Sequence, residues 1–97
     1  MKVLLICSAG MSTSLLVQNM LKFADPGDVV DALPFGELEA KITEYDVVLL
    51  GPQIRFKLKD GEKVAAEHGK PTDVIDMRAY GMMDGKTVID QARKLLA

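Results

Sequence analysis

Residues 4–20, LLICSAGMSTSLLVQNM, decide the fold that this sequence predicts. A run of branched apolar residues ends at Cys7, small and hydroxyl-bearing residues follow, and apolar side chains then recur at Leu16 and Met20. A short continuous apolar run is typical of a strand that is covered on both faces, whereas a spacing of four indicates one side of a helix. The stretch therefore predicts a strand, a loop and a helix in that order.

The same alternation continues to the end of the chain. Strands are predicted over residues 3–6, 28–33, 46–51 and 72–76, and helices over segments that contain residues 16–24, 34–43, 54–68 and 84–96. Asp31 indicates that the second strand lies at an edge of the sheet, and Asp84 is a candidate N-cap for the last helix. The inward helical positions are predicted to be Leu16, Met20, Phe23, Ala24, Ile54, Leu58, Ala65, Val88, Ile89, Ala92, Leu95 and Leu96.

Alternating strands and helices with right-handed crossovers predict a single α/β domain over residues 1–97. The expected architecture is a four-stranded parallel sheet with helices on both faces, in a topology that resembles flavodoxin and the low-molecular-weight tyrosine phosphatases. Ligands of such folds bind at the carboxyl ends of the strands, near the point where the strand order reverses. Cys7, residues 51–53 and Asp76 are all predicted to lie at those ends.

Composition and charge exclude several classes of function. Twelve basic and fourteen acidic residues give a net charge of -2 without a basic cluster, so nucleic-acid binding is not predicted. No stretch approaches the ~20 apolar residues of a membrane span, and the apolar run before Cys7 is too short for a signal peptide. A single cysteine cannot form an internal disulfide, which favours a cytoplasmic location. The carboxylates and the one histidine show no metal-ligand spacing, so neither a metal nor a cofactor is predicted.

The loop after Cys7 has the residue types that bind a phosphate group. Backbone N–H groups between a strand and a helix converge on a small concavity, where the helix dipole adds about half a positive charge. Gly10 permits the backbone angles of such a nest, Ala9 leaves room for an oxyanion, and Ser12 is a candidate N-cap. The same field favours a thiolate at Cys7, which predicts attack of sulfur on a bound phosphoryl group. Taken alone, the loop leaves open that Cys7 is a small core residue.

Several stretches of the sequence resemble one protein family. Residues 7–14 (CSAGMSTS) are similar to the active-site loop of the lactose/cellobiose-type enzyme IIB components of the bacterial phosphoenolpyruvate-dependent sugar phosphotransferase system. The likeness extends, in matching order over nearly the whole chain, to residues 47–53 (VVLLGPQ), 74–76 (VID) and 80–85 (YGMMDG). The combination is specific to this family, whereas the loop alone is only suggestive.

The resemblance implies a phosphoryl relay in which Cys7 is the nucleophile and the phosphorylation site. A phosphohistidine on a cognate IIA protein would phosphorylate Cys7, which would then phosphorylate a disaccharide of the cellobiose, chitobiose or lactose class bound by the membrane IIC transporter. The protein would thus be cytoplasmic and held at the inner face of the membrane through IIC. The implied phosphate cradle is Ser8, Ala9, Gly10, Met11, Ser12, Thr13 and Ser14, and the implied rim or partner surface is Pro52, Gln53, Asp76 and Tyr80.

Two other functions stay open. Low-molecular-weight tyrosine phosphatases resemble this chain in loop and topology, but Thr13 stands where their loop carries an arginine that clamps the phosphoryl group. Their general acid belongs to an Asp-Pro pair on a late loop, whereas Asp25-Pro26 follows the first predicted helix and is interpreted as structural. Slow hydrolysis of the phosphocysteine is therefore predicted. The other alternative is a flavodoxin-like binding module, although the chain has no tryptophan and its tyrosines lie away from the loop.

Some further residues are interpreted as structural or as surface. His68 and Gly69 are predicted to end the third helix, and Met77 is predicted to fill a gap in the core after a strand. Met11 and residues 82–83, which are also methionines, are candidates for a partner surface. The basic residues within 55–59 are interpreted as a solvated helix face rather than as contacts to an acidic partner.

Overall fold

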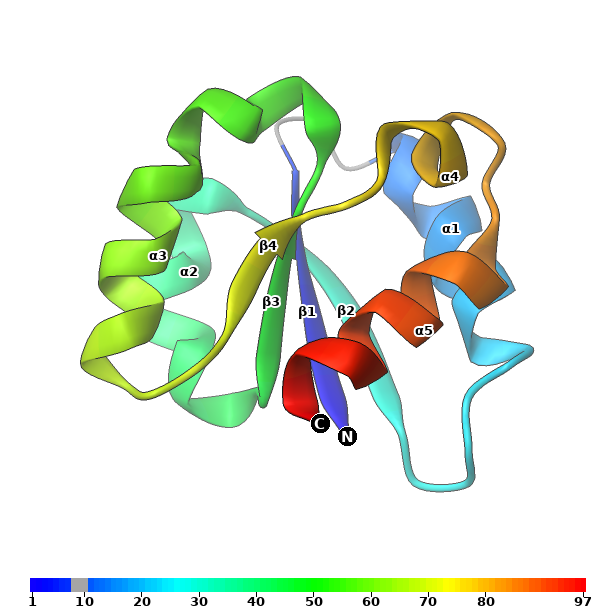
Figure 1. Cartoon of the computed structure of the whole chain (residues 1–97), viewed down its shortest axis with the longest axis horizontal. Helices are drawn as coiled ribbons and strands as arrows, with labels where there is room; N and C mark the ends of the chain where they lie inside the picture. Colours follow the sequence, from blue (N-terminus) through cyan, green and yellow to red (C-terminus); the bar gives the residue numbers. More distant parts are fainter. Residues whose placement is uncertain (8–10) are drawn as a thin grey trace.

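The fold alternates strands and helices from β1 to α5 (Figure 1). The computed structural model describes residues 1–7 and 11–97, and of residues 11 and 12 only the backbone. The α-helices, 3₁₀ helices (η) and strands follow in the order β1 (Lys2–Cys7), α1 (Met11–Leu21), β2 (Val29–Pro34), η1 (Phe35–Glu37), α2 (Leu38–Lys41), η2 (Ile42–Glu44), β3 (Val47–Leu50), η3 (Pro52–Lys57), α3 (Leu58–Glu67), β4 (Thr72–Val74), α4 (Met77–Gly81) and α5 (Gly85–Leu96).

The four strands run parallel in one sheet with the order β2-β1-β3-β4, which confirms the predicted α/β architecture. The register aligns Ile6 of β1 with Leu33 of β2 on one side and with Leu50 of β3 on the other. This is the strand order of flavodoxin-like folds, in which the direction of winding changes between β1 and β3. The carboxyl ends of these two central strands therefore border the crevice where such folds bind ligands.

Alternate side chains of β1 and β3 build separate cores on the two faces of the sheet. The odd-numbered positions pack with α1 and α5, and the even-numbered positions pack with α2 and α3. Figure 1 shows these two helix pairs on opposite sides of the sheet. Burial on both faces explains why the central strands are continuous apolar runs, and each fully buried aliphatic side chain contributes about 1.5–3 kcal/mol.

Side-chain hydrogen bonds hold both outer strands of the sheet. At β2, the hydroxyl of Tyr45 donates to Asp31 Oδ2 at 2.7 Å, and burial raises the pKa of Tyr45 to about 12. At β4, Gln91 Nε2 donates to the carbonyl of Val74 at 2.8 Å while its Oε1 accepts from the backbone N–H of Asp76 at 3.1 Å. A further parallel strand would bond this same pair of backbone groups, so Gln91 blocks the free edge of β4.

Gly85 allows α5 to approach α1 closely. A Cβ atom at this position would overlap the backbone of Asn19 and Met20. Beside this contact, Asn19 Nδ2 donates to the carbonyl of Met83 at 2.9 Å, and Met83 has a φ of 53°, in the left-handed region that L-residues rarely adopt. The contact therefore fixes α1 against the turn that joins α4 to α5.

Several inward positions differ from the prediction. α1 ends at Leu21, and the tighter bond from the N–H of Phe23 to the carbonyl of Met20 (3.0 Å) turns Phe23 out of the helix stripe, so that it is 48% exposed. Leu58, at the start of α3, is only half-buried. Leu96, at the last position of α5, is exposed because a helix end has fewer packing neighbours.

α4 was not predicted, and it changes the position of Met77. Asp76 turns the chain out of β4 and begins a helix in which Ala79 is the buried residue. Met77 is the first residue of that helix and is exposed instead of filling a gap in the core. The fourth strand consequently ends at Val74, two residues earlier than predicted.

Candidate functional site

Cys7 lies at the junction of β1 and the segment that leads to α1. Its side chain is 2% exposed, and its Sγ lies 3.1 Å from Oγ1 of Thr13, a contact in which either atom can donate. Thr13 is fully buried in the first turn of α1. An α-helix leaves the N–H groups of its first turn without intrahelical partners, and its dipole is positive at that end. The sulfur therefore lies where the backbone favours an anion.

The structure tests only part of the predicted phosphate cradle. The backbone of Ser12 corrects one prediction: α1 begins at Met11, so Ser12 is the second residue of the helix and not its N-cap. An N-cap has non-helical backbone angles, whereas the backbone of Ser12 is already helical. Ser14 is exposed, directly after the buried Thr13. Outside the described residues lie Ser8, Ala9 and Gly10, together with the side chains of Met11 and Ser12.

The segment after β3 borders the same end of the sheet. The N–H of Gly51 donates to the carbonyl of Ile6 at 2.7 Å, which holds this segment beside the end of β1. Pro52 is buried and Gln53 is exposed. Gln53 Nε2 donates to the hydroxyl oxygen of Tyr80 at 3.1 Å, so η3 is linked to α4. The structure thus brings together Gln53 and Tyr80, two of the predicted rim residues.

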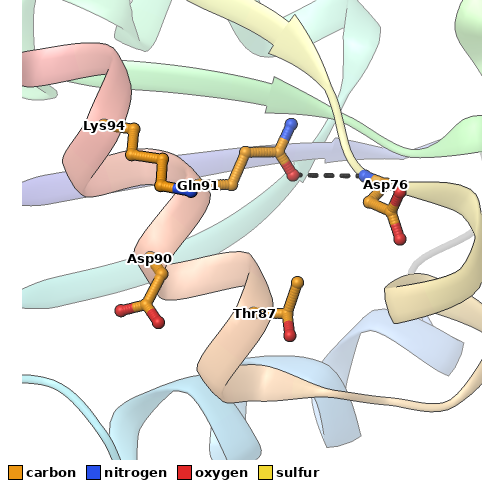
Figure 2. Close-up of a pocket in the computed structure, with 5 residues that line it drawn as sticks. All are labelled: Asp76, Thr87, Asp90, Gln91 and Lys94. Atoms are coloured by element: carbon orange, nitrogen blue, oxygen red, sulfur yellow. Dashed lines mark hydrogen bonds between the residues drawn. The ribbon is translucent and has the colours of Figure 1, made fainter.

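Asp76 organises the helix that carries Tyr80. Its Oδ2 accepts from the N–H of Ala79 at 2.9 Å and caps α4, and its carbonyl accepts from the N–H of Tyr80 at 2.9 Å. Figure 2 shows Gln91 reaching from α5 toward the backbone of Asp76. Asp76 therefore holds the start of α4 in place, and its carboxylate is engaged in this cap.

A cavity of about 440 Å³ lies between the end of β4 and α5, beside this rim (Figure 2). Of the described residues, neither Cys7 nor Thr13 lines it. Lys86 Nζ lies 3.1 Å from Asp90 Oδ2, and this hydrogen bond holds the pKa of Asp90 below its usual value. The cavity is a polar groove whose carboxylates already have partners. Its lining residues are Asp76, Thr87, Asp90, Gln91 and Lys94.

Asp84 caps α5 as predicted. Its Oδ1 accepts from the N–H of Thr87 at 3.2 Å and its Oδ2 accepts from the Thr87 hydroxyl at 2.7 Å. These bonds, the one from the hydroxyl first, hold the pKa of Asp84 below its usual value. The carboxylate is therefore committed to starting the helix.

The Asp25-Pro26 turn and His68, both interpreted as structural, lie at the other end of the sheet. The turn with Asp25 and Pro26 leads into β2, and the N–H of Val29 donates to the carbonyl of Met1 at 3.0 Å, beside the amino end of β1. His68 is exposed at the C-cap of α3, and Gly69 follows it with a φ of 67° before the chain enters β4. Neither Asp25 nor His68 is placed to exchange a proton at Cys7.

Within residues 1–7 and 11–97, no three His, Cys, Asp or Glu side chains are grouped so that they could hold a metal ion. No helix in this part of the chain is long and apolar enough to cross a membrane.

Gln91 and Asn19 hold neighbouring elements in place near the candidate site, and the sequence did not predict either role. Gln91 falls on the polar face of the last predicted helix, where a glutamine at the surface needs no explanation. Its contacts with Val74 and Asp76 depend on how closely α5 passes the edge of β4. No signal in a single sequence distinguishes such a glutamine from a solvated one.

The chain is similar to known proteins along nearly its whole length. The family model for the lactose/cellobiose-specific IIB subunit of the PTS system matches residues 2–91. The chain is 43% identical over 98 residues to the oligo-beta-mannoside-specific EIIB component of the PTS system of Bacillus subtilis (strain 168), covering 98% of this chain and 95% of that protein. It is also 43% identical over 102 residues to the cellobiose-specific EIIB component of Lactococcus lactis subsp. lactis (strain IL1403), covering 95% and 93%.

A solved structure agrees with these relatives. The solution structure of the cellobiose-specific phosphotransferase IIB component protein from Borrelia burgdorferi superposes with a TM-score of 0.80 at 38% identity. The match covers 98% of this chain and 90% of that chain, so the fold and the sequence point to the same group of proteins.

Proposed function

Because the chain belongs to the lactose/cellobiose-specific IIB subunits of the phosphotransferase system, we propose that Cys7 accepts a phosphoryl group and passes it to a sugar. EIIB components are phosphotransferases that work with IIA and IIC partners. In this chain, the donor is the phosphohistidine of a cognate IIA protein, and the acceptor is a disaccharide bound by a membrane IIC transporter. The observation that carries the proposal is the position of Cys7 Sγ, 3.1 Å from Thr13 Oγ1 in the first turn of α1.

The proposed reaction consists of two transfers at one sulfur atom. In the first, the thiolate of Cys7 attacks phosphorus, an S–P bond forms, and the P–N bond to the donor imidazole breaks, leaving the electron pair on nitrogen. In the second, a sugar hydroxyl attacks phosphorus and releases its proton to solvent, the S–P bond breaks with its electron pair staying on sulfur, and the thiolate is regenerated. N–H groups between β1 and α1, with the hydroxyl of Thr13, would bind the phosphoryl oxygens as charge develops on them.

Hydrolysis is the competing reaction, and two features favour transfer over it. Thr13 supplies a neutral hydroxyl at the loop position where the phosphatases that the chain resembles have an arginine. The only Asp-Pro pair of the chain, Asp25 and Pro26, lies beside the amino end of β1 and not at Cys7. A phosphocysteine in this setting lacks the positioned acid that speeds the release of phosphate, so it should persist until an acceptor arrives.

The sugar is proposed only as a class. Two relatives of equal identity to this chain, 43%, are named for different sugars, oligo-beta-mannoside and cellobiose. Similarity therefore favours an oligosaccharide or disaccharide of the cellobiose, chitobiose or lactose kind without selecting one. In the proposed relay the IIC transporter binds the sugar, which places this protein at the cytoplasmic face of the membrane.

Intact-mass measurement tests the proposed phosphoryl acceptor. The wild-type protein, incubated with phosphoenolpyruvate, the upstream phosphocarrier proteins and a lactose/cellobiose-type IIA protein, should gain the mass of one phosphoryl group. Cys7→Ser should gain none, because a serine hydroxyl is a far weaker nucleophile than a thiolate at neutral pH.

Two controls make that result interpretable. Omission of the IIA protein should abolish the adduct, and Cys7→Ser should melt close to the wild-type temperature. A wild-type protein that stays at its unmodified mass would contradict the proposal, as would a Cys7→Ser variant that gains the same mass.

A further inference from the structure

The side chain of Gln53 folds back over the backbone of Gly51. A Cβ atom at Gly51 would lie 2.6 Å from Oε1 of Gln53 and 3.1 Å from its Cδ. The backbone of Gly51 is extended, with a φ of -60° and a ψ of 145°, which any residue adopts. Glycine is therefore needed here for space and not for its backbone angles, and the amide of Gln53 occupies that space.

This amide lies on the same face of the sheet as the sulfur of Cys7. The odd-numbered positions of β1 and β3 face α1 and α5, and both Cys7 and the Cβ position of Gly51 continue that alternation. The N–H of Gly51 donates to the carbonyl of Ile6 at 2.7 Å, so the end of β3 lies beside the end of β1 at the strand spacing of about 4.8 Å. The amide of Gln53 is consequently a neighbour of Cys7 across the sheet.

Tyr80 holds the amide of Gln53 on this face. Nε2 of Gln53 donates to the hydroxyl oxygen of Tyr80 at 3.1 Å, and Tyr80 packs against the core that the sheet forms with α1 and α5. An amide nitrogen carries two hydrogens, and the second one has no partner in the part of the chain that the structure describes. Gln53 therefore has a positioned donor left for a group that is bound at Cys7.

We propose that the amide of Gln53 binds the phosphoryl group on Cys7 and, because it cannot take up a proton, protects the phosphocysteine from water. This inference rests on the proposed function and names a residue that favours transfer over hydrolysis. In hydrolysis, water attacks phosphorus and gives up a proton, while the S–P bond breaks with its electron pair staying on sulfur. A carboxylate beside the phosphoryl group would accept that proton and speed the step by about 10²–10⁴-fold, whereas an amide is not basic enough to do so.

Two substitutions of similar length separate the two roles of Gln53. Gln53→Met removes the donor without adding a base, so phosphorylation of Cys7 by a phosphorylated lactose/cellobiose-type IIA protein should slow roughly tenfold, while the lifetime of the phosphocysteine in buffer stays within about twofold of the wild type. Gln53→Glu adds a base, so that lifetime should fall at least about tenfold, with release of inorganic phosphate. Intact mass at timed intervals, before and after removal of the donor, measures the rate and the lifetime.

Gln18→Glu is the matched control for the added charge. Gln18 is an exposed glutamine on α1, so the same substitution there should change neither the rate of phosphorylation nor the lifetime. Gln53 is exposed as well, so its variants should melt at the wild-type temperature.

Gly51→Ala tests the position of the amide without altering Gln53. The added methyl group would displace the amide, so phosphorylation should slow as it does in Gln53→Met, with an unchanged lifetime. In a Gln53→Ala background, where no amide remains to be displaced, Gly51→Ala should have little further effect.

The contrary outcomes identify which statement is wrong. A wild-type rate of phosphorylation in Gln53→Met would show that the amide does not bind the phosphoryl group. A wild-type lifetime in Gln53→Glu, or an equal loss of lifetime in Gln18→Glu, would show that Gln53 does not protect the phosphocysteine. Each of these results overturns the inference while leaving the phosphorylation of Cys7 intact, whereas a wild-type protein that is never phosphorylated overturns the proposed function itself.

Discussion

Thr13 places an uncharged hydroxyl 3.1 Å from the sulfur of Cys7, in a fully buried position. A hydroxyl offers one donor and no charge, whereas a guanidinium offers several charged donors in a fixed fork. Such a group can orient the thiolate and bind a phosphoryl oxygen, but it stabilises the extra charge of a hydrolytic transition state less than arginine would. At the scale of one residue, this difference is consistent with a cysteine that holds a phosphoryl group for transfer.

Removing this hydroxyl should slow the phosphorylation of Cys7. Thr13→Val keeps the shape of the side chain but loses a hydrogen bond to a charged group, which predicts a rate roughly 10–100-fold lower. Thr13→Ser keeps a hydroxyl and should retain most of the rate. The initial rate of mass gain at a fixed concentration of the phosphorylated IIA protein measures the effect. Equal rates for Thr13→Val and the wild type would show that the contact has no part in the transfer.

Individual contacts were less predictable from the sequence than individual residues. Cys7 could be identified because it ends an apolar run before small, hydroxyl-bearing residues. The partner of its sulfur could not, because that contact depends on how α1 is placed relative to the end of β1. Gln53 and Tyr80 were both expected at the rim, but their hydrogen bond joins residues that are 27 positions apart and depends on the placement of α4.

At the scale of the helices, α5 packs closely against the carboxyl-terminal half of α1. Gly85 makes this contact possible because its missing Cβ leaves room for the backbone of Asn19 and Met20. The hydrogen bond from Asn19 to the carbonyl of Met83 adds a fixed point at the adjacent turn. The backbone of α5 thus packs directly on the backbone of α1, the helix that carries Thr13, and such packing tolerates little change in spacing.

Gly85→Ala should therefore destabilise the fold. An added methyl group would force α1 and α5 apart, at a cost of about 1–3 kcal/mol, which lowers Tm by roughly 4–8 °C for each kcal/mol in a domain of this size. Gly36→Ala is the matched control, because a Cβ at Gly36 would meet nothing within 4 Å. Thermal unfolding followed by circular dichroism measures both variants. Equal melting temperatures for the two would mean that the packing of α1 on α5 is looser than described.

The strands and the long helices followed the sequence pattern, whereas the short helix α4 did not. The strands were recognisable as short apolar runs, and the long helices because apolar side chains recur along one face. α4 has 5 residues, too few to show a period, and it depends on the cap that Asp76 provides. The end of α1 was also predicted too late. The helix ends at Leu21, and the N–H of Phe23 bonds to the carbonyl of Met20, so Phe23 does not extend the apolar face of the helix.

At the scale of the whole molecule, the strand order β2-β1-β3-β4 brings distant segments to the end of the sheet where Cys7 lies. η3 and α4 follow the carboxyl ends of β3 and β4 and carry Gln53 and Tyr80. The turn with Asp25 and Pro26 is directed to the opposite end. The topology therefore gathers these segments beside Cys7, whereas Asp25, the candidate general acid of a phosphatase, lies away from it.

The lifetime of the phosphorylated protein tests this account most directly. The wild-type protein is phosphorylated by the IIA protein, freed of the donor, and followed by intact mass in buffer alone and after addition of membranes that contain IIC and sugar. We expect the adduct to persist in buffer and to disappear on addition of the membranes and sugar, with formation of sugar phosphate. Rapid loss of the adduct in buffer, with release of inorganic phosphate, would contradict the account and indicate a phosphatase.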